Sequence, residues 1–263
     1  MPFAEFTLER DGATTPVWHR VGDGSQWVLL LHGSGMDHRS MEVLLAGLPA
    51  HADVLLPDLR GQGEAVLAPG VHAFFDDIVA DCVALLDRVS ATSVTVIGHS
   101  YGSHVAQELA WMLPERVDRL VLIGCHDQHR HRTVGERTRV AAVSALARVM
   151  SWERFARLSA QVGGDDVELR DSIEQGHLRC GRDVFLDLGQ SASRSLHTVD
   201  GYAQPILLLA GEREYSRAFD RRYARIASRT HAVGIQVVED AGHMCHQEQP
   251  AEVTEAIAEF LAR

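Results

Sequence analysis

Residues 94–102 read VTVIGHSYG, and this stretch decides how the chain folds. Its first four residues are all β-branched, which is typical of a buried strand. The next five match the pattern G-x-S-x-G, and residues 104–112 then show the apolar spacing of a helix. Glycines beside the serine permit a sharp strand-to-helix turn that exposes the Ser100 hydroxyl. The amide of Tyr101 comes at the start of the helix, where negative charge is stabilised. This turn therefore predicts a nucleophile and part of an oxyanion site.

The rest of the chain alternates strands with helices. Strands are predicted at 3–9, 16–21, 27–31, 53–57, 94–97, 120–123, 205–211 and 235–238. Helical spacing appears at 41–48, 75–89, 104–112 and 250–261. Strands that are apolar throughout, such as Trp27–Leu31, are typical of sheets covered on both faces. We expect an α/β fold, with a mostly parallel sheet of about eight strands between two layers of helices.

Residues 126–204 break this alternation, because they contain no convincing strand. They predict helices at 134–150, 152–162, 167–177 and 184–189. A helical insertion after the sixth predicted strand would lie over the carboxyl edge of the sheet, where ligands bind in open α/β sheets. We therefore expect a core of residues 1–125 and 205–263, with residues 126–204 as a helical cap.

Composition limits the partners and the compartment. The chain of 263 residues has a formal net charge of −11, which argues against a nucleic-acid surface. No apolar run approaches the length of a membrane span, and the N-terminal residues lack a signal pattern. The cysteines lack the spacing of a metal site or a disulfide framework; they are Cys82, Cys125, Cys180 and Cys245. We expect a cytoplasmic protein that binds a small molecule, with no membrane and no nucleic acid as partner.

Several short motifs together resemble those of the α/β-hydrolase family, over nearly the whole chain. They are HGSG at 32–35, DLRGQG at 58–63, GHSYG at 98–102, PERV at 114–117, the stretch 205–214, and AGH at 241–243. The resemblance is to the serine-nucleophile branch with a helical cap, since the dehalogenase and epoxide-hydrolase branches place a carboxylate where Ser100 stands. It implies Ser100 as nucleophile, His243 as base, an acid after the seventh predicted strand, and no cofactor.

The chemistry of the residues supports these roles independently. A serine hydroxyl needs an adjacent base, and a histidine near its free pKa can accept and return a proton. His243 follows a predicted strand in an Ala-Gly turn, from which its ring could reach Ser100. The alternative is a surface histidine, because the chain contains 15 of them.

The acid has two candidates. The family usually has aspartate where this chain has Glu214, and glutamate can serve in a Ser-His-Glu triad. The order serine, acid, histidine and the position in the loop both favour Glu214. The alternative acid is Asp127, just after the sixth predicted strand. Glu212 is expected on the surface, and either candidate could instead be a solvated loop carboxylate.

The oxyanion hole is expected from the amides of Tyr101 and Ser34. Ser34 follows the strand 27–31 in a glycine-rich loop whose backbone can approach the site. The other interpretation of this segment is a simple turn, and whether the Ser34 hydroxyl also donates stays open.

Two other features look reactive. Residues 126–131 read HDQHRH, a metal-like composition with no second ligand group at a recognisable spacing, so we expect a polar hinge and no metal. Cys245 lies two residues after His243. A small packed thiol is the ordinary state of such a cysteine, and Ser100 is the better nucleophile by context.

The cap should shape the pocket. Its aromatic and apolar residues at helical spacing are candidates for contact with substrate, Trp152 and Phe155 first, then Leu158 and Phe185. They could equally pack the cap against itself or form a homodimer contact. Most cap arginines fit solvated helix faces, but one or two pointing inward would indicate an acidic substrate. They include Arg130, Arg132, Arg137, Arg139, Arg148 and Arg157.

Three functional hypotheses follow. The first is a serine hydrolase that cleaves an ester, lactone, thioester or carbon–carbon bond of a small molecule through an acyl-enzyme. The second is a non-hydrolytic enzyme with the same pocket, such as a cofactor-independent oxygenase, lyase or cyclase. The third is a ligand-binding receptor or inactive relative. A complete set of serine, histidine and acid favours the first.

Overall fold

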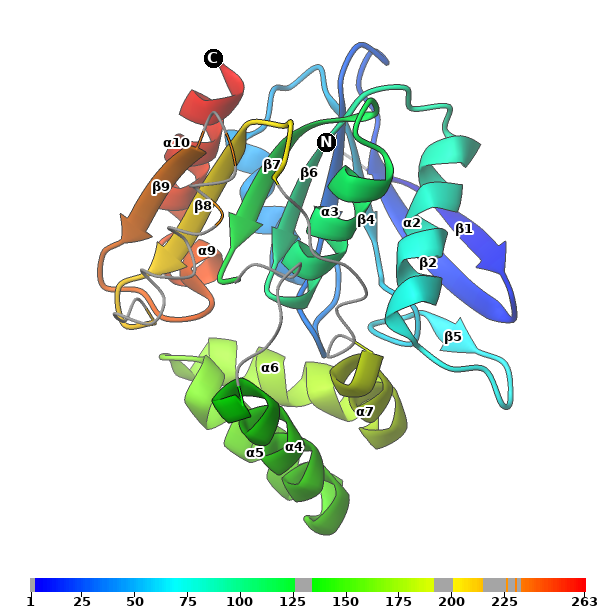
Figure 1. The fold of residues 1–263 in the computed structure, drawn as a ribbon, viewed down its shortest axis with the longest axis vertical. Coiled ribbons are helices and arrows are strands. Elements are labelled where there is room, and N and C mark those ends of the chain that lie inside the picture. The colour runs from blue at the N-terminus through cyan, green and yellow to red at the C-terminus, as the bar shows by residue number, and fades with distance from the viewer. Residues whose placement is uncertain (1–2, 126–133, 192–200, 215–225, 227–229, 231–232) are drawn as a thin grey trace.

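We describe a computed structural model of the chain, for residues 3–125, 134–191, 201–214, 226, 230 and 233–263. One sheet of nine strands runs through these residues in the order β1-β2-β4-β3-β6-β7-β8-β9, with β5 paired to β2 (Figure 1). The strands are β1 Ala4–Arg10, β2 Ala13–Arg20, β3 Trp27–Leu31, β4 Asp53–Pro57, β5 Val66–Leu67, β6 Val94–His99, β7 Val117–Ile123, β8 Ile206–Gly211 and β9 Val233–Val238.

The sheet is mostly parallel, as predicted. Strands β4, β3, β6, β7, β8 and β9 pair in parallel, whereas β1, β2 and β5 add an antiparallel edge. The ninth strand, β5, was not expected because two residues are too short to show a period in the sequence.

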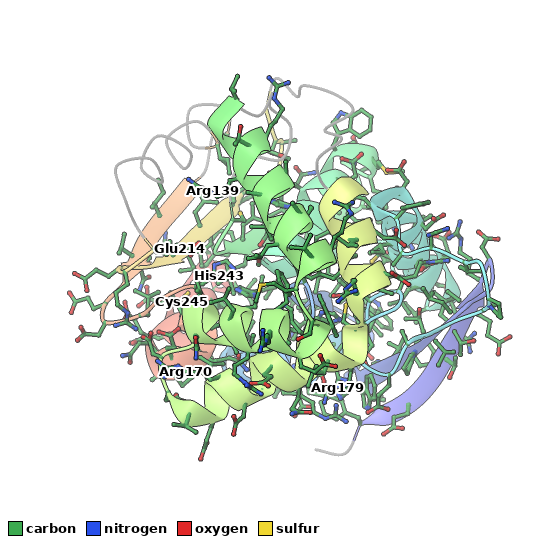
Figure 2. The ribbon with its side chains drawn as sticks, turned by 90° about the horizontal axis from the view of Figure 1, so that it is seen from below. Arg139, Arg170, Arg179, Glu214, His243 and Cys245 are labelled. Atoms are coloured by element: carbon green, nitrogen blue, oxygen red, sulfur yellow. The ribbon has the colours of Figure 1, made fainter. Side chains whose placement is uncertain are left out.

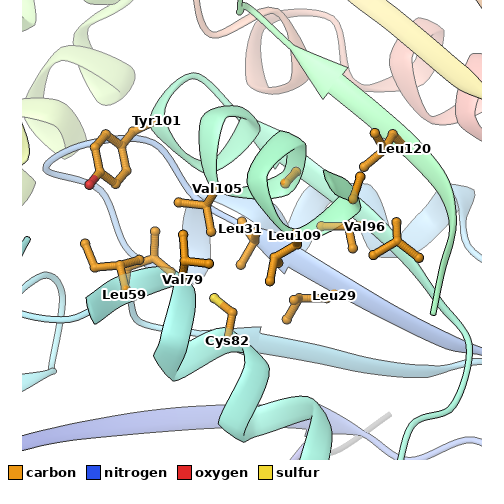
Figure 3. Close-up of a cluster of buried hydrophobic side chains, with 14 of the residues drawn as sticks. Leu29, Leu31, Leu59, Val79, Cys82, Val96, Tyr101, Val105, Leu109 and Leu120 are labelled. Carbon is orange, nitrogen blue, oxygen red and sulfur yellow. The ribbon is translucent and has the colours of Figure 1, made fainter. Parts of the chain in front are cut away.

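Helices cover both faces of the sheet. On one face lie α2 (Phe75–Arg88) and α3 (Tyr101–Met112), and their apolar sides enclose the core shown in Figure 3. On the other face η1 (Val43–Gly47) and α10 (Pro250–Leu261) pack over a second core. The helix predicted at 41–48 is instead α1 (Arg39–Glu42) followed by the 3-10 helix η1. A short helix, α9 (Cys245–Glu248), precedes α10.

Four further helices lie beyond the carboxyl ends of the parallel strands (Figure 1). They are α4 (Val134–Val149), α5 (Trp152–Gly163), α6 (Val167–Cys180) and α7 (Arg182–Ser191), and each overlaps a helix predicted from the sequence. Asp166 caps α6 by accepting a hydrogen bond from the amide of Leu169 at 2.7 Å. The two junctions with the sheet, 126–133 and 192–200, lie outside the described residues. No helix of the described part is long and apolar enough to cross a membrane.

Candidate active site

Ser100 stands at the turn between β6 and α3. Its φ of 50° is a left-handed conformation that is rare for a residue with a side chain. The two flanking glycines explain how the turn fits: a Cβ on Gly98 would overlap the backbone of Gly102, and a Cβ on Gly102 would overlap the carbonyl of Leu31. The amide of Ser100 donates to the carbonyl of Ile123 at 2.8 Å, which ties the turn to β7. This strained turn holds the Ser100 hydroxyl at the carboxyl edge of the sheet.

His243 lies between Ser100 and Glu214. Its Nε2 is 3.0 Å from the Ser100 Oγ, and its Nδ1 is 2.8 Å from Oε1 of Glu214. Glu214 is the third residue after β8, and its amide donates to the carbonyl of Gly211 at 3.1 Å. Figure 2 shows Glu214 and His243 close together beneath the cap helices. The structure thus joins three residues of the predicted set in one hydrogen-bonded chain.

The pKa of His243 lies above its ordinary value of 6.5. Burial alone would lower this pKa, but the hydrogen bond with Glu214 and the negative charges of Glu214 and Glu248 outweigh burial. A carboxylate on Nδ1 also leaves Nε2 facing the serine as the proton acceptor when the ring is neutral. The arrangement therefore yields a more basic histidine directed at a hydroxyl.

Two buried histidines support the base without carrying charge. Nε2 of His99 donates to the backbone carbonyl of His243 at 3.0 Å, and the ring of His246 lies 4.5 Å from that of His99. Burial and the neighbouring histidines lower the pKa of His99 well below its usual range. Burial and His243 lower the pKa of His246 to about 3. Both rings are therefore neutral packing groups near neutral pH.

The loop after β3 carries Ser34 toward Ser100. Nε2 of His32 accepts a hydrogen bond from the amide of Leu59 at 2.9 Å, and Oε1 of Gln62 accepts one from the amide of Gly35 at 2.7 Å. Leu59 and Gln62 of the DLRGQG motif thus hold this loop in place through hydrogen bonds. Ser34 and Tyr101 line the same cavity as Ser100, so the two residues expected to supply oxyanion donors lie beside it.

Helix α6 also packs against this loop. A Cβ on Gly176 would overlap the carbonyl oxygen of Gly35, so the helix backbone rests directly on the loop. Arg179 of α6 forms an ion pair with Asp37 at 2.8 Å. Met36 packs with cap residues in a small apolar cluster. These contacts could not be predicted from the sequence, because a glycine within a helix does not indicate long-range packing.

Two cavities open around Ser100, His243 and Glu214. The smaller, about 330 Å³, is lined by the three sequence-predicted residues Ser34, Ser100 and Tyr101. From the cap, it is lined by Arg139, Val140, Val143, Ser144, Phe185, Leu188 and Gly189. The larger, about 630 Å³, is lined by His243 and Glu214 and by apolar residues of α4 and α5. Val143 borders both cavities, so they adjoin.

The aromatic candidates of the cap occupy different places. Phe155 and Leu158 line the larger cavity, and Phe185 lines the smaller. Trp152 is not among the residues that line either cavity; its Nε1 donates to the carbonyl of His177 at 3.0 Å and its ring stacks on Phe155. These contacts make Trp152 a support for Phe155.

Three candidates from the sequence remain: Asp127, the segment 126–131 and Cys245. Asp127 and the rest of the segment 126–131 lie outside the described residues. Within the described residues, no group of three or more histidine, cysteine or acidic side chains could hold a metal ion. Cys245 is fully buried, and burial together with the charges of Glu214 and Glu248 raises the pKa of its thiol to about 12. A neutral, buried thiol is a poor nucleophile.

Known proteins share this architecture. A curated relative from Bacillus subtilis, "Putative 2-succinyl-6-hydroxy-2,4-cyclohexadiene-1-carboxylate synthase", is 28% identical, with 95% of this chain and 96% of the relative covered. "Esterase Rv0045c" of Mycobacterium tuberculosis is 26% identical over 99% of this chain and 90% of its own length. The structure of a thermophilic esterase from Thermogutta terrifontis superimposes with a TM-score of 0.79 at 21% identity, covering all of this chain and 98% of the other. The model of the "Alpha/beta hydrolase family" matches residues 28–256, and the chain belongs to that family.

Proposed function

We propose that this enzyme is a serine hydrolase that cleaves a small-molecule acyl compound through a Ser100–His243–Glu214 triad. The observation that carries the proposal is the chain of two hydrogen bonds, 3.0 Å from Ser100 to His243 and 2.8 Å from His243 to Glu214. Each bond lies within the range expected of a nucleophile, its base and the group that orients the base.

The geometry supports a two-step mechanism. His243 accepts the Ser100 proton while Oγ attacks the substrate carbonyl, and Glu214 stabilises the imidazolium that forms. The amides of Tyr101 and Ser34 would hold the developing oxyanion. His243 then returns the proton to the leaving group as the bond to the carbonyl carbon breaks. Water, activated by His243, releases the acid from the Ser100 ester in the second step.

The bond cleaved could be an ester, a lactone, a thioester or a carbon–carbon bond next to a carbonyl, because the triad serves all four. A panel of 4-nitrophenyl esters, lactones, acyl thioesters and β-diketones would distinguish them. We expect activity on at least one class, with Ser100→Ala losing it down to the residual catalysis of binding and the oxyanion site. Full activity in Ser100→Ala would contradict the proposal.

A second function is favoured by one specific finding, which is that the relative from Bacillus subtilis is named a synthase. In a non-hydrolytic enzyme, His243 would act as a base on the substrate itself, and no acyl group would reach Ser100. Intact-mass spectrometry during turnover separates the two. A serine hydrolase gives a transient acyl adduct on the protein, whereas a lyase or cyclase gives product with no adduct.

A further inference from the structure

Arg139 brings a positive charge to the cavity above Ser100. Among the described residues that line this cavity, Arg139 is the one arginine, and no lysine or acidic residue is present. The other walls are apolar side chains, hydroxyls and the imidazole of His104. In the described part of the chain, no acidic side chain forms an ion pair with Arg139. Figure 2 labels Arg139 on α4, which lies in front of the sheet in this view. The protein as a whole carries a net charge of −11. The guanidinium of Arg139 is therefore the local positive charge that an anion would contact in this cavity.

The larger cavity is different, because its charges are already compensated. Arg213 forms ion pairs with Asp165 and with Glu248, and Glu214 is hydrogen-bonded to His243. The other walls are mostly apolar side chains of α4 and α5, with the hydroxyl of Ser159 among them. This cavity therefore suits an uncharged, apolar group.

The position of each cavity relative to the triad decides which half of the substrate it receives. The carbonyl oxygen must point toward the amides of Ser34 and Tyr101, and these residues line the smaller cavity. The leaving group must accept its proton from His243, and His243 lines the larger cavity. The acyl part then extends toward Arg139, and the leaving group lies between α4 and α5.

We propose that the enzyme takes a short acyl group that ends in a carboxylate, bound by Arg139, joined to an apolar leaving group. The inference rests on the proposed serine hydrolase mechanism, and adds the substrate class to it. A volume of about 330 Å³ is at the small end of ligand cavities, so a short chain fits. The planar guanidinium can bind a carboxylate with two parallel hydrogen bonds.

Three benzyl esters test the proposal. Monobenzyl glutarate carries a carboxylate on the acyl side, benzyl hexanoate is its neutral counterpart, and 4-carboxybenzyl hexanoate carries the charge on the leaving group. We expect the highest kcat/KM for monobenzyl glutarate, and a preference that weakens at high salt because ions screen exposed charges. Equal kcat/KM for the first two esters, or the highest value for 4-carboxybenzyl hexanoate, would overturn the proposal.

Variants identify the residue responsible. Arg139→Gln should reduce kcat/KM for monobenzyl glutarate by about tenfold or more, the range of a lost charge-assisted hydrogen bond, and should affect benzyl hexanoate much less. Arg139→Lys should recover part of the loss. Arg137→Gln is the matched control, because Arg137 lies on the same helix but lines neither cavity. An equal loss on both esters in Arg139→Gln, or an equal loss in Arg137→Gln, would contradict the role of Arg139.

A binding measurement separates this inference from the proposed function. Calorimetric titration of Ser100→Ala with monobenzyl glutarate needs no turnover, and the double variant Ser100→Ala/Arg139→Gln should bind about tenfold more weakly. If the esters are hydrolysed through Ser100 but binding is indifferent to Arg139, this inference fails and the hydrolase stands. If binding depends on Arg139 but no ester is cleaved, the hydrolase fails and the anion site stands.

Discussion

The carbonyl oxygen of Gly35 packs so closely against Gly176 that a Cβ atom on Gly176 would overlap it. Gly35 follows Ser34 in the loop after β3, and Gly176 belongs to cap helix α6. The loop that would supply one oxyanion donor is thus held between α6 and the side chain of Gln62. Helix α6 therefore supports the loop after β3, next to Ser100.

The first prediction follows from this contact. Gly176→Ala should push the Gly35 carbonyl away and displace the neighbouring Ser34 amide, so that kcat falls by up to about 10²-fold while KM changes little. Steady-state kinetics measures this split. The affinity for a trifluoromethyl ketone, which mimics the tetrahedral intermediate, should fall in parallel with kcat.

Gly135→Ala is the matched control for that variant. Gly135 lies on cap helix α4, and a Cβ placed there meets no atom within 4 Å, so alanine should leave kcat unchanged. If Gly176→Ala lowers Tm but leaves kcat and inhibitor affinity intact, the contact is structural only, and the positioning role of α6 is wrong.

The second prediction concerns Glu214. Glu214→Gln keeps the shape of the side chain but removes the charge that orients and stabilises the His243 imidazolium, so kcat should fall by roughly 10³–10⁴. Asp127→Asn should change kcat much less, since Glu214 is the acid hydrogen-bonded to His243. The opposite ranking of these two variants would move the acid to Asp127.

A third prediction uses the pKa of His243. Only the neutral ring accepts a proton, so kcat/KM should rise with pH, with a midpoint above the ordinary value of 6.5. Glu214→Gln removes the negative charge that raises this pKa, both through space and through the charge-assisted hydrogen bond, but not the burial that lowers it. The midpoint should therefore move to lower pH. A midpoint that stays in place, or moves upward, would show that Glu214 does not set the pKa of the base.

The sequence predicted the parts of the site that depend on short-range patterns. Ser100 and the glycines at 98 and 102 lie within five consecutive residues, and the strained turn needs all three. Arg139 is different: the cap arginines look alike in the sequence, and only packing decides which of them lines the cavity. The contact of Gly35 with Gly176 joins segments that are distant in the chain, so no local pattern of residues in the sequence predicts it. Trp152 has the spacing of a pocket residue, but its indole N–H donates to the carbonyl of His177, and Trp152 lines neither cavity.

The fourth prediction tests the structural part of the DLRGQG motif. Arg60 is fully buried and pairs with Asp81 of α2 through two hydrogen bonds, at 2.7 and 2.9 Å. Asp81→Leu would leave a buried guanidinium without its carboxylate and should lower the free energy of unfolding by about 3–5 kcal/mol. Asp87→Ala, on the same helix, breaks an exposed pair with Arg116 and should cost about 1 kcal/mol or less. Equal losses in urea denaturation would contradict this account.

Covalent labelling with a fluorophosphonate, followed by peptide mass spectrometry, tests most directly whether Ser100 is the activated nucleophile. If His243 activates Ser100, each chain should carry one label, on Ser100. Ser100→Ala should carry no label, and labelling of His243→Ala should be greatly slowed. Iodoacetamide should leave the labelling rate unchanged, since the Cys245 thiol is buried with a pKa of about 12. A label on any other residue, or labelling at the same rate in His243→Ala, would contradict the assignment of Ser100 as the activated nucleophile.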